Sequence, residues 1–176
     1  QRKVGITTVL VTHDIHEAFA MSDRIAVMNS GQIEQVGTPV DIYARPSTSF
    51  TAQFSGQTNR LEGRVKSRED ESATVETDSG LTLKLPGSHI TGGTDDRITM
   101  MLRPERIRLG SQPRGLENRF EGTIESMTYL GSTILYQVRI GDTELMVQSP
   151  NRGEEGYRPG TQVCVEWNDG DVYVQY

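Results

Sequence analysis

The chain has 176 residues, with 18 Lys and Arg against 24 Asp and Glu, a net charge of −6 and a sequence pI near 5.1. This size allows one or two small domains, and the acidic balance argues against a partner bound through nucleic-acid phosphates. No apolar run reaches the roughly 18 residues of a membrane-spanning helix, and no secretory signal pattern opens the chain. The single Cys164 excludes an internal disulfide, as is usual in the cytoplasm, and we expect it to be a small core residue.

The first thirty residues predict a strand, a helix and a second strand. Residues 6–12 are a β-branched, apolar run typical of a strand buried on both faces. Residues 15–21 have the apolar spacing of a helix, and residues 24–29 form a second apolar run. This order is typical of a parallel α/β sheet, in which functional residues lie at the carboxyl ends of the strands. We expect His13 to lie at such an end.

Five short motifs then follow one another within the first 55 residues. They are Val-Thr-His-Asp at 11–14, Glu-Ala at 17–18, Ser-Asp-Arg-Ile-Ala-Val-Met at 22–28, Gly-Gln-Ile at 31–33 and Gly-Thr-Pro at 37–39. Their order and spacing resemble the end of the nucleotide-binding domain in ATP-binding cassette (ABC) subunits of bacterial importers. The resemblance implies that His13 is the switch-loop residue facing the γ-phosphate of ATP. The chain departs from this pattern at Ile15-His16, where relatives commonly carry Gln-Glu.

From the residues alone, His13 has two interpretations. It either caps the end of a strand or positions the γ-phosphate and the attacking water, and the family resemblance favours the second. Imidazole can donate or accept a hydrogen bond near neutral pH, and phosphoryl transfer depends mostly on positioning and charge stabilisation. Asp14 is expected to cap the helix. His13, His16 and Glu17 lack the spacing of a two-histidine zinc site, so we expect no metal there.

Residues 29–56 predict a hairpin and two short helices. Ser30-Gly31 is a two-residue turn between apolar runs. Thr38 is expected to be the N-cap of a helix that ends near Ala44, because Arg45 precedes a proline. Ser47 is expected to cap a second helix, which Gly56 ends.

Beyond residue 57 the pattern changes to short alternating runs. Fifteen of the eighteen glycines lie beyond residue 55. Many short strands divided by turn residues predict a small barrel or sandwich. The expected strands are 60–65, 73–77, 81–85, 98–102, 120–126, 134–140, 145–148, 162–167 and 172–175.

This region contains an internal repeat. Residues 61–67 (LEGRVKS) reappear as residues 120–126 (FEGTIES), and Gly93-Thr94 parallels Gly160-Thr161. Two units of roughly sixty residues predict two related β-barrel halves. The region also resembles the TOBE domain, an OB-like barrel that follows the ATPase domain in importer subunits. The matching motifs are Arg103-Pro104-Glu105, Tyr129-Leu130-Gly131-Ser132 and the closing Gly160, Val163, Val165 and Trp167.

The resemblance therefore implies two domains. Residues 1–55 are expected to be an α/β fragment, the end of a P-loop ABC ATPase domain, and residues 56–176 an all-β TOBE domain with a regulatory or dimer-forming role. The pattern from residue 129 to 153 most resembles the spermidine/putrescine (polyamine) branch. The resemblance implies that the intact protein uses ATP and Mg²⁺ as cofactors. Its implied partners are a second ATPase subunit and membrane permease subunits. Its implied location is peripheral, on the cytoplasmic face of the inner membrane.

The sequence lacks a phosphate-binding loop. No Gly-x-x-x-x-Gly-Lys-Ser/Thr occurs, so we expect the chain alone neither to bind ATP tightly nor to hydrolyse it. The opening Gln1-Arg2-Lys3 is typical of a helix tail and suggests a fragment of a longer protein. Without its neighbours the strand at residues 6–12 is expected to leave residues 1–55 self-associating or partly disordered, while the β region folds independently.

Pairs of β-barrel halves are compatible with two other functions. The paired barrels could bind a small oxyanion such as molybdate or sulfate where the halves meet, with Lys66, Ser126 and Ser132 as candidate ligands that form no convincing cluster. Binding of single-stranded nucleic acid needs a basic groove with stacking aromatics. Residues 56–176 carry 14 Lys and Arg against 19 Asp and Glu, so nucleic acid is not an expected partner.

Overall fold

The computed structural model describes residues 5–153 and 156–175. The chain divides into two compact units, Gln1–Gln57 (unit 1) and Thr58–Tyr176 (unit 2). The helix tail expected at Gln1-Arg2-Lys3 lies outside the described residues. Among those residues, no helix has the length and apolar character needed to cross a membrane.

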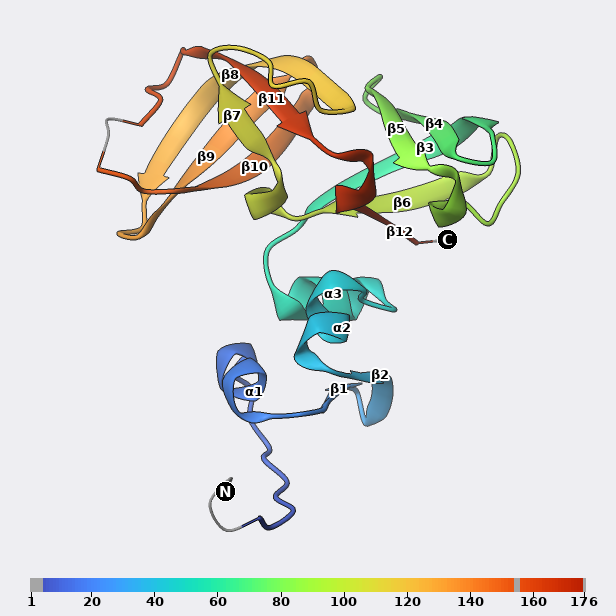
Figure 1. Cartoon of the computed structure of the whole chain (residues 1–176), viewed down its shortest axis with the longest axis vertical. Coiled ribbons are helices and arrows are strands. Elements are labelled where there is room, and N and C mark those ends of the chain that lie inside the picture. Colours follow the sequence, from blue (N-terminus) through green and yellow to red (C-terminus); the bar gives the residue numbers. More distant parts are fainter. Residues whose placement is uncertain (1–4, 154–155, 176) are drawn as a thin grey trace. The chain divides into compact units, whose positions relative to one another are not determined.

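Unit 1 contains three short helices and one hairpin (Figure 1). Its elements are α1 (Ile15–Met21), β1 (Ile25–Asn29), β2 (Gln32–Gly37), α2 (Pro39–Ala44) and α3 (Ser49–Ser55). The predicted hairpin is confirmed: Ser30 and Gly31 have φ angles of 50° and 80°, the positive values that a type I′ turn needs. The small core of unit 1 is formed by Ile25, Val27 and Ile42.

The helix starts follow the capping residues in the sequence. Asp14 caps α1 by accepting a hydrogen bond from the His16 N–H at 2.8 Å. Thr38 caps α2 in a reciprocal capping box with Asp41. The prediction for α3 is wrong by one residue, because Thr48 is its N-cap. Ser47 instead hydrogen-bonds to the side chain of Gln35 on β2.

The strand predicted at residues 6–12 is not formed. This segment runs without strand pairing up to His13, and Val9 and Val11 are 86% and 92% exposed. A strand with two apolar faces is stable only between neighbouring strands and covering helices, and no described strand of unit 1 pairs with residues 6–12. The expected parallel sheet is also absent from the described part of unit 1, where β1 and β2 pair antiparallel.

Unit 2 consists of two curled, five-stranded antiparallel sheets (Figure 1). Their strand orders are β12-β6-β3-β4-β5 and β10-β9-β8-β11-β7. All nine predicted runs are strands; β7 was missed because it has three residues. The strands are β3 (Asn59–Arg68), β4 (Ser72–Thr77), β5 (Thr82–Pro86), β6 (Arg97–Leu102), β7 (Arg108–Gly110), β8 (Asn118–Tyr129), β9 (Thr133–Ile140), β10 (Thr143–Pro150), β11 (Gln162–Trp167) and β12 (Val172–Gln175).

The predicted internal repeat is confirmed by topology. The two halves have the same strand order. The first half is ordered β6-β3-β4-β5, and the second is ordered β11-β8-β9-β10. The register of each hairpin shifts at the same place in the repeat, between Val65 and Ser67 in β3 and between Ile124 and Ser126 in β8. These bulges bend the strands and curl each sheet.

Each half completes the sheet of the other half. Strand β7 follows β6 in the chain but pairs with β11, and β12 follows β11 but pairs with β6. A 3-10 turn precedes each crossing strand, at Pro104–Arg106 (η2) and Asp169–Asp171 (η3). The exchange joins the two halves into one hydrophobic core that includes Leu83, Val138 and Trp167.

Two equivalent asparagines also join the halves. The amide of Asn59 on β3 donates to the Met146 carbonyl at 2.8 Å and accepts from the Met146 N–H at 2.7 Å. Asn118 on β8 bonds in the same way to the carbonyl and N–H of Lys84, at 2.9 and 2.7 Å. Each buried amide therefore satisfies a backbone donor and acceptor on a strand of the opposite half.

Candidate functional site

His13 lies at a bend between the extended N-terminal segment and α1, where its side chain is exposed. The backbone around it is fixed by short polar contacts. The Thr12 hydroxyl donates to the Glu17 carboxylate at 2.7 Å and accepts from the Asp14 N–H at 3.0 Å. The structure thus presents His13 to solvent beside a capped helix start, without the strand that the sequence predicted before it.

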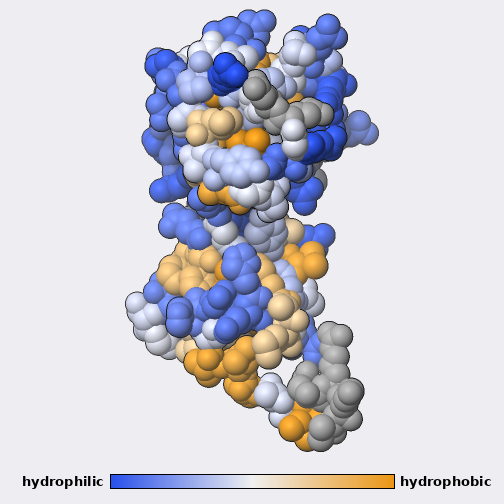
Figure 2. All heavy atoms as spheres, turned by 90° about the vertical axis from the view of Figure 1, so that its left-hand side faces the viewer, coloured by the Kyte–Doolittle hydropathy of each residue, from blue (hydrophilic) through white to orange (hydrophobic). Residues whose placement is uncertain are grey.

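An apolar groove of about 590 Å³ lies in unit 1 beside this bend. Residues 8–12, α1, residues 22–28 and Phe54 contribute to its lining. Of thirteen large apolar side chains exposed in the described residues, ten belong to unit 1, and Figure 2 shows several of them gathered on one face. Apolar surface gathered in this way is typical of a packing or binding surface.

No complete metal or phosphate site accompanies His13. Within residues 5–153 and 156–175, no three His, Cys, Asp or Glu side chains gather where they could hold a metal ion. The sequence has no phosphate-loop lysine.

The candidate oxyanion ligands do not form a cluster within the described residues. Lys66 on β3 forms an ion pair with Glu76 at 3.0 Å, with both side chains about half exposed. Ser126 lies on β8 in the other sheet, and Ser132 lies in the β8–β9 turn, where its carbonyl accepts from the Asn151 N–H at 2.9 Å. These contacts are structural, so this grouping gives no oxyanion site.

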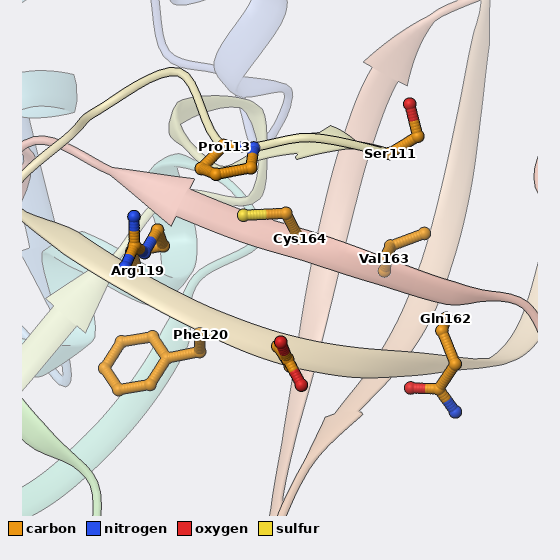
Figure 3. A pocket seen from close by; sticks show the side chains of 8 residues that line it. Ser111, Pro113, Arg119, Phe120, Gln162, Val163 and Cys164 are labelled. Atoms are coloured by element: carbon orange, nitrogen blue, oxygen red, sulfur yellow. The ribbon is translucent and has the colours of Figure 1, made fainter.

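The structure contains a second pocket, of about 540 Å³, that the sequence did not predict (Figure 3). Strands β8 and β11 form most of its lining, together with Ser111 and Pro113 of the linker between the halves. The carboxylate of Glu166 accepts hydrogen bonds from the N–H groups of Arg114 and Gly115 at 2.8 and 3.2 Å and so holds this linker. The lining residues are Ser111, Pro113, Arg119, Phe120, Glu121, Gln162, Val163 and Cys164.

Cys164 is in this pocket and not in the core, which corrects the prediction from sequence. Its neighbours Val163 and Val165 point into the core, so Cys164 points to the opposite face of the strand. Partial burial, and next the negative charge of Glu166, raise the pKa of the Cys164 thiol. A thiol with a raised pKa stays protonated near neutral pH and is a poor nucleophile. Cys164 is therefore not an activated nucleophile.

Comparison with protein families adds a match to unit 2. Residues 100–174 match the model of the TOBE domain, which spans β6 to β12 and so includes both crossing strands. The match begins inside the first half and covers the whole second half of the repeat.

Comparison with curated proteins gives relatives along nearly the whole chain. The spermidine/putrescine import ATP-binding protein PotA of Trichodesmium erythraeum is 40% identical over 177 residues, which cover 95% of this chain and 46% of that protein. PotA of Thermobifida fusca is 40% identical over 178 residues, with 99% and 46% covered. PotA of a Nostoc species is 42% identical over 173 residues, with 97% and 45% covered. The chain thus spans slightly less than half the length of these relatives.

Comparison with solved structures gives a likeness in fold. The cytoplasmic molybdate-binding protein ModG, solved with molybdate bound, superposes with a TM-score of 0.59 at 13% identity. The superposition covers 66% of this chain and 94% of that protein. At this identity the likeness concerns the fold, two joined β-barrel halves, and carries no conclusion about a ligand.

Proposed function

We propose that the chain is the counterpart of the C-terminal part of ABC importer ATP-binding subunits and that it acts in polyamine import. The observation that carries the proposal is the identity of about 40% with PotA proteins over 95% or more of the chain. The intact protein would couple ATP hydrolysis to uptake of spermidine or putrescine.

In this proposal unit 1 is the end of the nucleotide-binding domain and unit 2 is the TOBE domain. The relatives are about twice as long as the chain, and the phosphate loop and the acidic Mg²⁺ ligand would belong to the part that the chain does not span. The apolar groove and the exposed residues 6–11 support this assignment, because a sheet and helices packed there would bury them.

We assign to His13 the role of a γ-phosphate contact in the assembled site. Its exposed position beside a fixed helix start supports this role, since a group that acts on a substrate must stay accessible. ATP and Mg²⁺ would be bound by the intact protein. Its partners would be a second ATPase subunit and membrane permease subunits, with the protein peripheral on the cytoplasmic face of the inner membrane. Unit 2 would regulate the ATPase or join two subunits.

The test is His13→Ala in a full-length protein that restores the phosphate loop. We expect ATP hydrolysis to fall on the order of 10²-fold, the scale of losing one positioned catalytic group, while ATP binding stays close to that of the parent. His16→Ala is the matched control, because His16 is also exposed but lies on α1. Parent-like turnover in His13→Ala, or an equal loss in both variants, would reject the role of His13.

A further inference from the structure

Strand β12 is bound by an edge that belongs to the other half of the repeat. It pairs antiparallel with β6, from Val172 opposite Leu102 to Gln175 opposite Thr99. Val172 is 1% exposed, and its carbonyl is 3.2 Å from Nδ1 of His89. We call the edge of β6 from Thr99 to Leu102, together with His89, the acceptor edge.

The connection that brings β12 to the acceptor edge is short. It consists of residues 168–171, in which the Asn168 amide bonds to the Asp171 carboxylate at 2.9 Å. Asp171 also lies 3.6 Å from the Arg106 guanidinium on η2. A Cβ added at Gly170 would meet no atom within 4 Å. Residues 168–171 thus form the hinge, and β12 itself is attached by its pairing with β6 and by the burial of Val172 in the core.

We propose that the acceptor edge also binds β12 of a second copy of the chain, so that two copies exchange this strand reciprocally. Donor and acceptor already belong to different halves, and on its other side the acceptor edge pairs with β3 of its own half. The strand pairs, the burial of Val172 and the His89 contact are therefore the same whether β12 arrives from its own chain or from another. Exchange of an identical element is a low-cost route to a dimer because few native contacts are lost.

Protein concentration decides between the two arrangements. Within one chain, the hinge gives β12 a fixed effective concentration at the acceptor edge. A second copy competes in proportion to its own concentration when both chains fold together. The ratio of exchanged dimer to monomer should therefore rise about in proportion to the concentration during refolding.

A disulfide across the strand pair measures this exchange in the full chain. Thr99→Cys and Gln175→Cys place two cysteines on directly opposed residues, and the Cα spacing of opposed residues, about 4.5–5.5 Å, falls within the range of a disulfide. Both changes are made in a Cys164→Ser background. The control pair, Ser67→Cys with Thr74→Cys, is opposed within the β3–β4 hairpin, which cannot exchange by opening the hinge.

Refolding at rising concentration and non-reducing electrophoresis then separate the outcomes. We expect the 99/175 pair to give covalent dimer in rising proportion while the control pair gives only monomer. In a second arm, the Thr99→Cys and Gln175→Cys chains are refolded together, and mixed disulfide in excess of the homodimers that each chain forms alone indicates exchange between copies. No mixed disulfide at any concentration, with the 99/175 variant monomeric throughout, would overturn the proposal. The outcome is independent of the proposed function, because no nucleotide or transport step is involved.

Discussion

At the scale of single residues, Asn59 and Asn118 hold the halves of unit 2 together. Asn59→Ala would leave the N–H and carbonyl of Met146 without their side-chain partner, at a cost of about 1–3 kcal/mol in the free energy of unfolding. Asn118→Ala should cost about the same, because its bonds to Lys84 are equivalent. Urea unfolding measures both values.

Arg60→Ala is the control for these variants. Arg60 neighbours Asn59, but its ion pair with Glu62 at 2.6 Å is partly exposed, at 54% and 28% of the two side chains, and exposed pairs contribute at most about 1 kcal/mol. If Asn59→Ala and Asn118→Ala had the same free energy of unfolding as Arg60→Ala, the role of the two amides would be contradicted. The repeated residues 61–67 and 120–126 predicted two similar halves, but both asparagines lie just outside those stretches, and nothing in the sequence indicated which backbone groups they meet.

Cys164 gives a second prediction at this scale. Burial raises the pKa of its thiol, Glu166 raises it further, and Glu121 adds a smaller effect in the same direction. Glu121→Gln removes a negative charge that disfavours the thiolate, so the pKa should fall and alkylation by iodoacetamide at a fixed mildly alkaline pH should become faster. Glu144→Gln, on β10, is the control. An unchanged or slower rate in Glu121→Gln alone would show that Glu121 does not act on the thiol.

At the scale of elements, the capping box of α2 illustrates how local chemistry fixes a helix start. Thr38→Ala removes the acceptor of the Asp41 N–H at 3.2 Å and should destabilise α2 by about 0.5–2 kcal/mol, measured as lost helical signal and faster hydrogen exchange in residues 39–44. Thr82→Ala, on an exposed strand position, is the comparison. Retention of full protection in Thr38→Ala would contradict the role of the cap.

The same box predicts a dependence on acid. Hydrogen bonds from the Thr38 side chain, and then its backbone, lower the pKa of Asp41 from the usual 3.8. A group whose pKa is lower in the folded state stabilises the fold above its unfolded pKa, and this contribution is lost as the pH falls through the folded value. Protection of α2 should therefore decline below about pH 4, and less so in Asp41→Asn.

Residues 6–12 are the segment of unit 1 for which the strand prediction from sequence is wrong. Their β-branched, apolar pattern predicted a buried strand, yet the segment stays unpaired in the structure. The pattern predicts which side chains are buried when the strand forms. It does not indicate whether the strands that would pair with this segment are present. The hairpin turn at Ser30-Gly31 was predictable because its geometry depends on two residues alone.

At the scale of the whole molecule, the crossing strands should make unit 2 unfold as one body. Leu83 on β5 and Leu145 on β10 occupy equivalent places in the two halves, and both are fully buried. Leu83→Ala and Leu145→Ala should each cost about 2–5 kcal/mol. Trp167, the single tryptophan of the chain, lies on β11 in the second half. Its fluorescence should nevertheless report Leu83→Ala in the first half as fully as Leu145→Ala.

Independent halves would give a different result. In that case Leu83→Ala would leave the fluorescence transition of Trp167 unchanged, while a far-UV signal would split into two steps. Val40→Ala, an exposed position of unit 1, is the control and should move neither transition of unit 2.

The sequence by itself determined what depends on neighbouring residues: the capping residues Asp14 and Thr38, the hairpin turn, the nine longer strands, the repeat and the motif around His13. Tertiary structure decided what depends on residues far apart in the chain. The exchange of β7 and β12, the asparagine contacts across the halves and the pocket around Cys164 arise because two similar halves share one core. A sequence repeat predicts that the two halves have similar folds. Which edge strands pair is set by the backbone N–H and C=O groups at the sheet edges that have no partner within their own half.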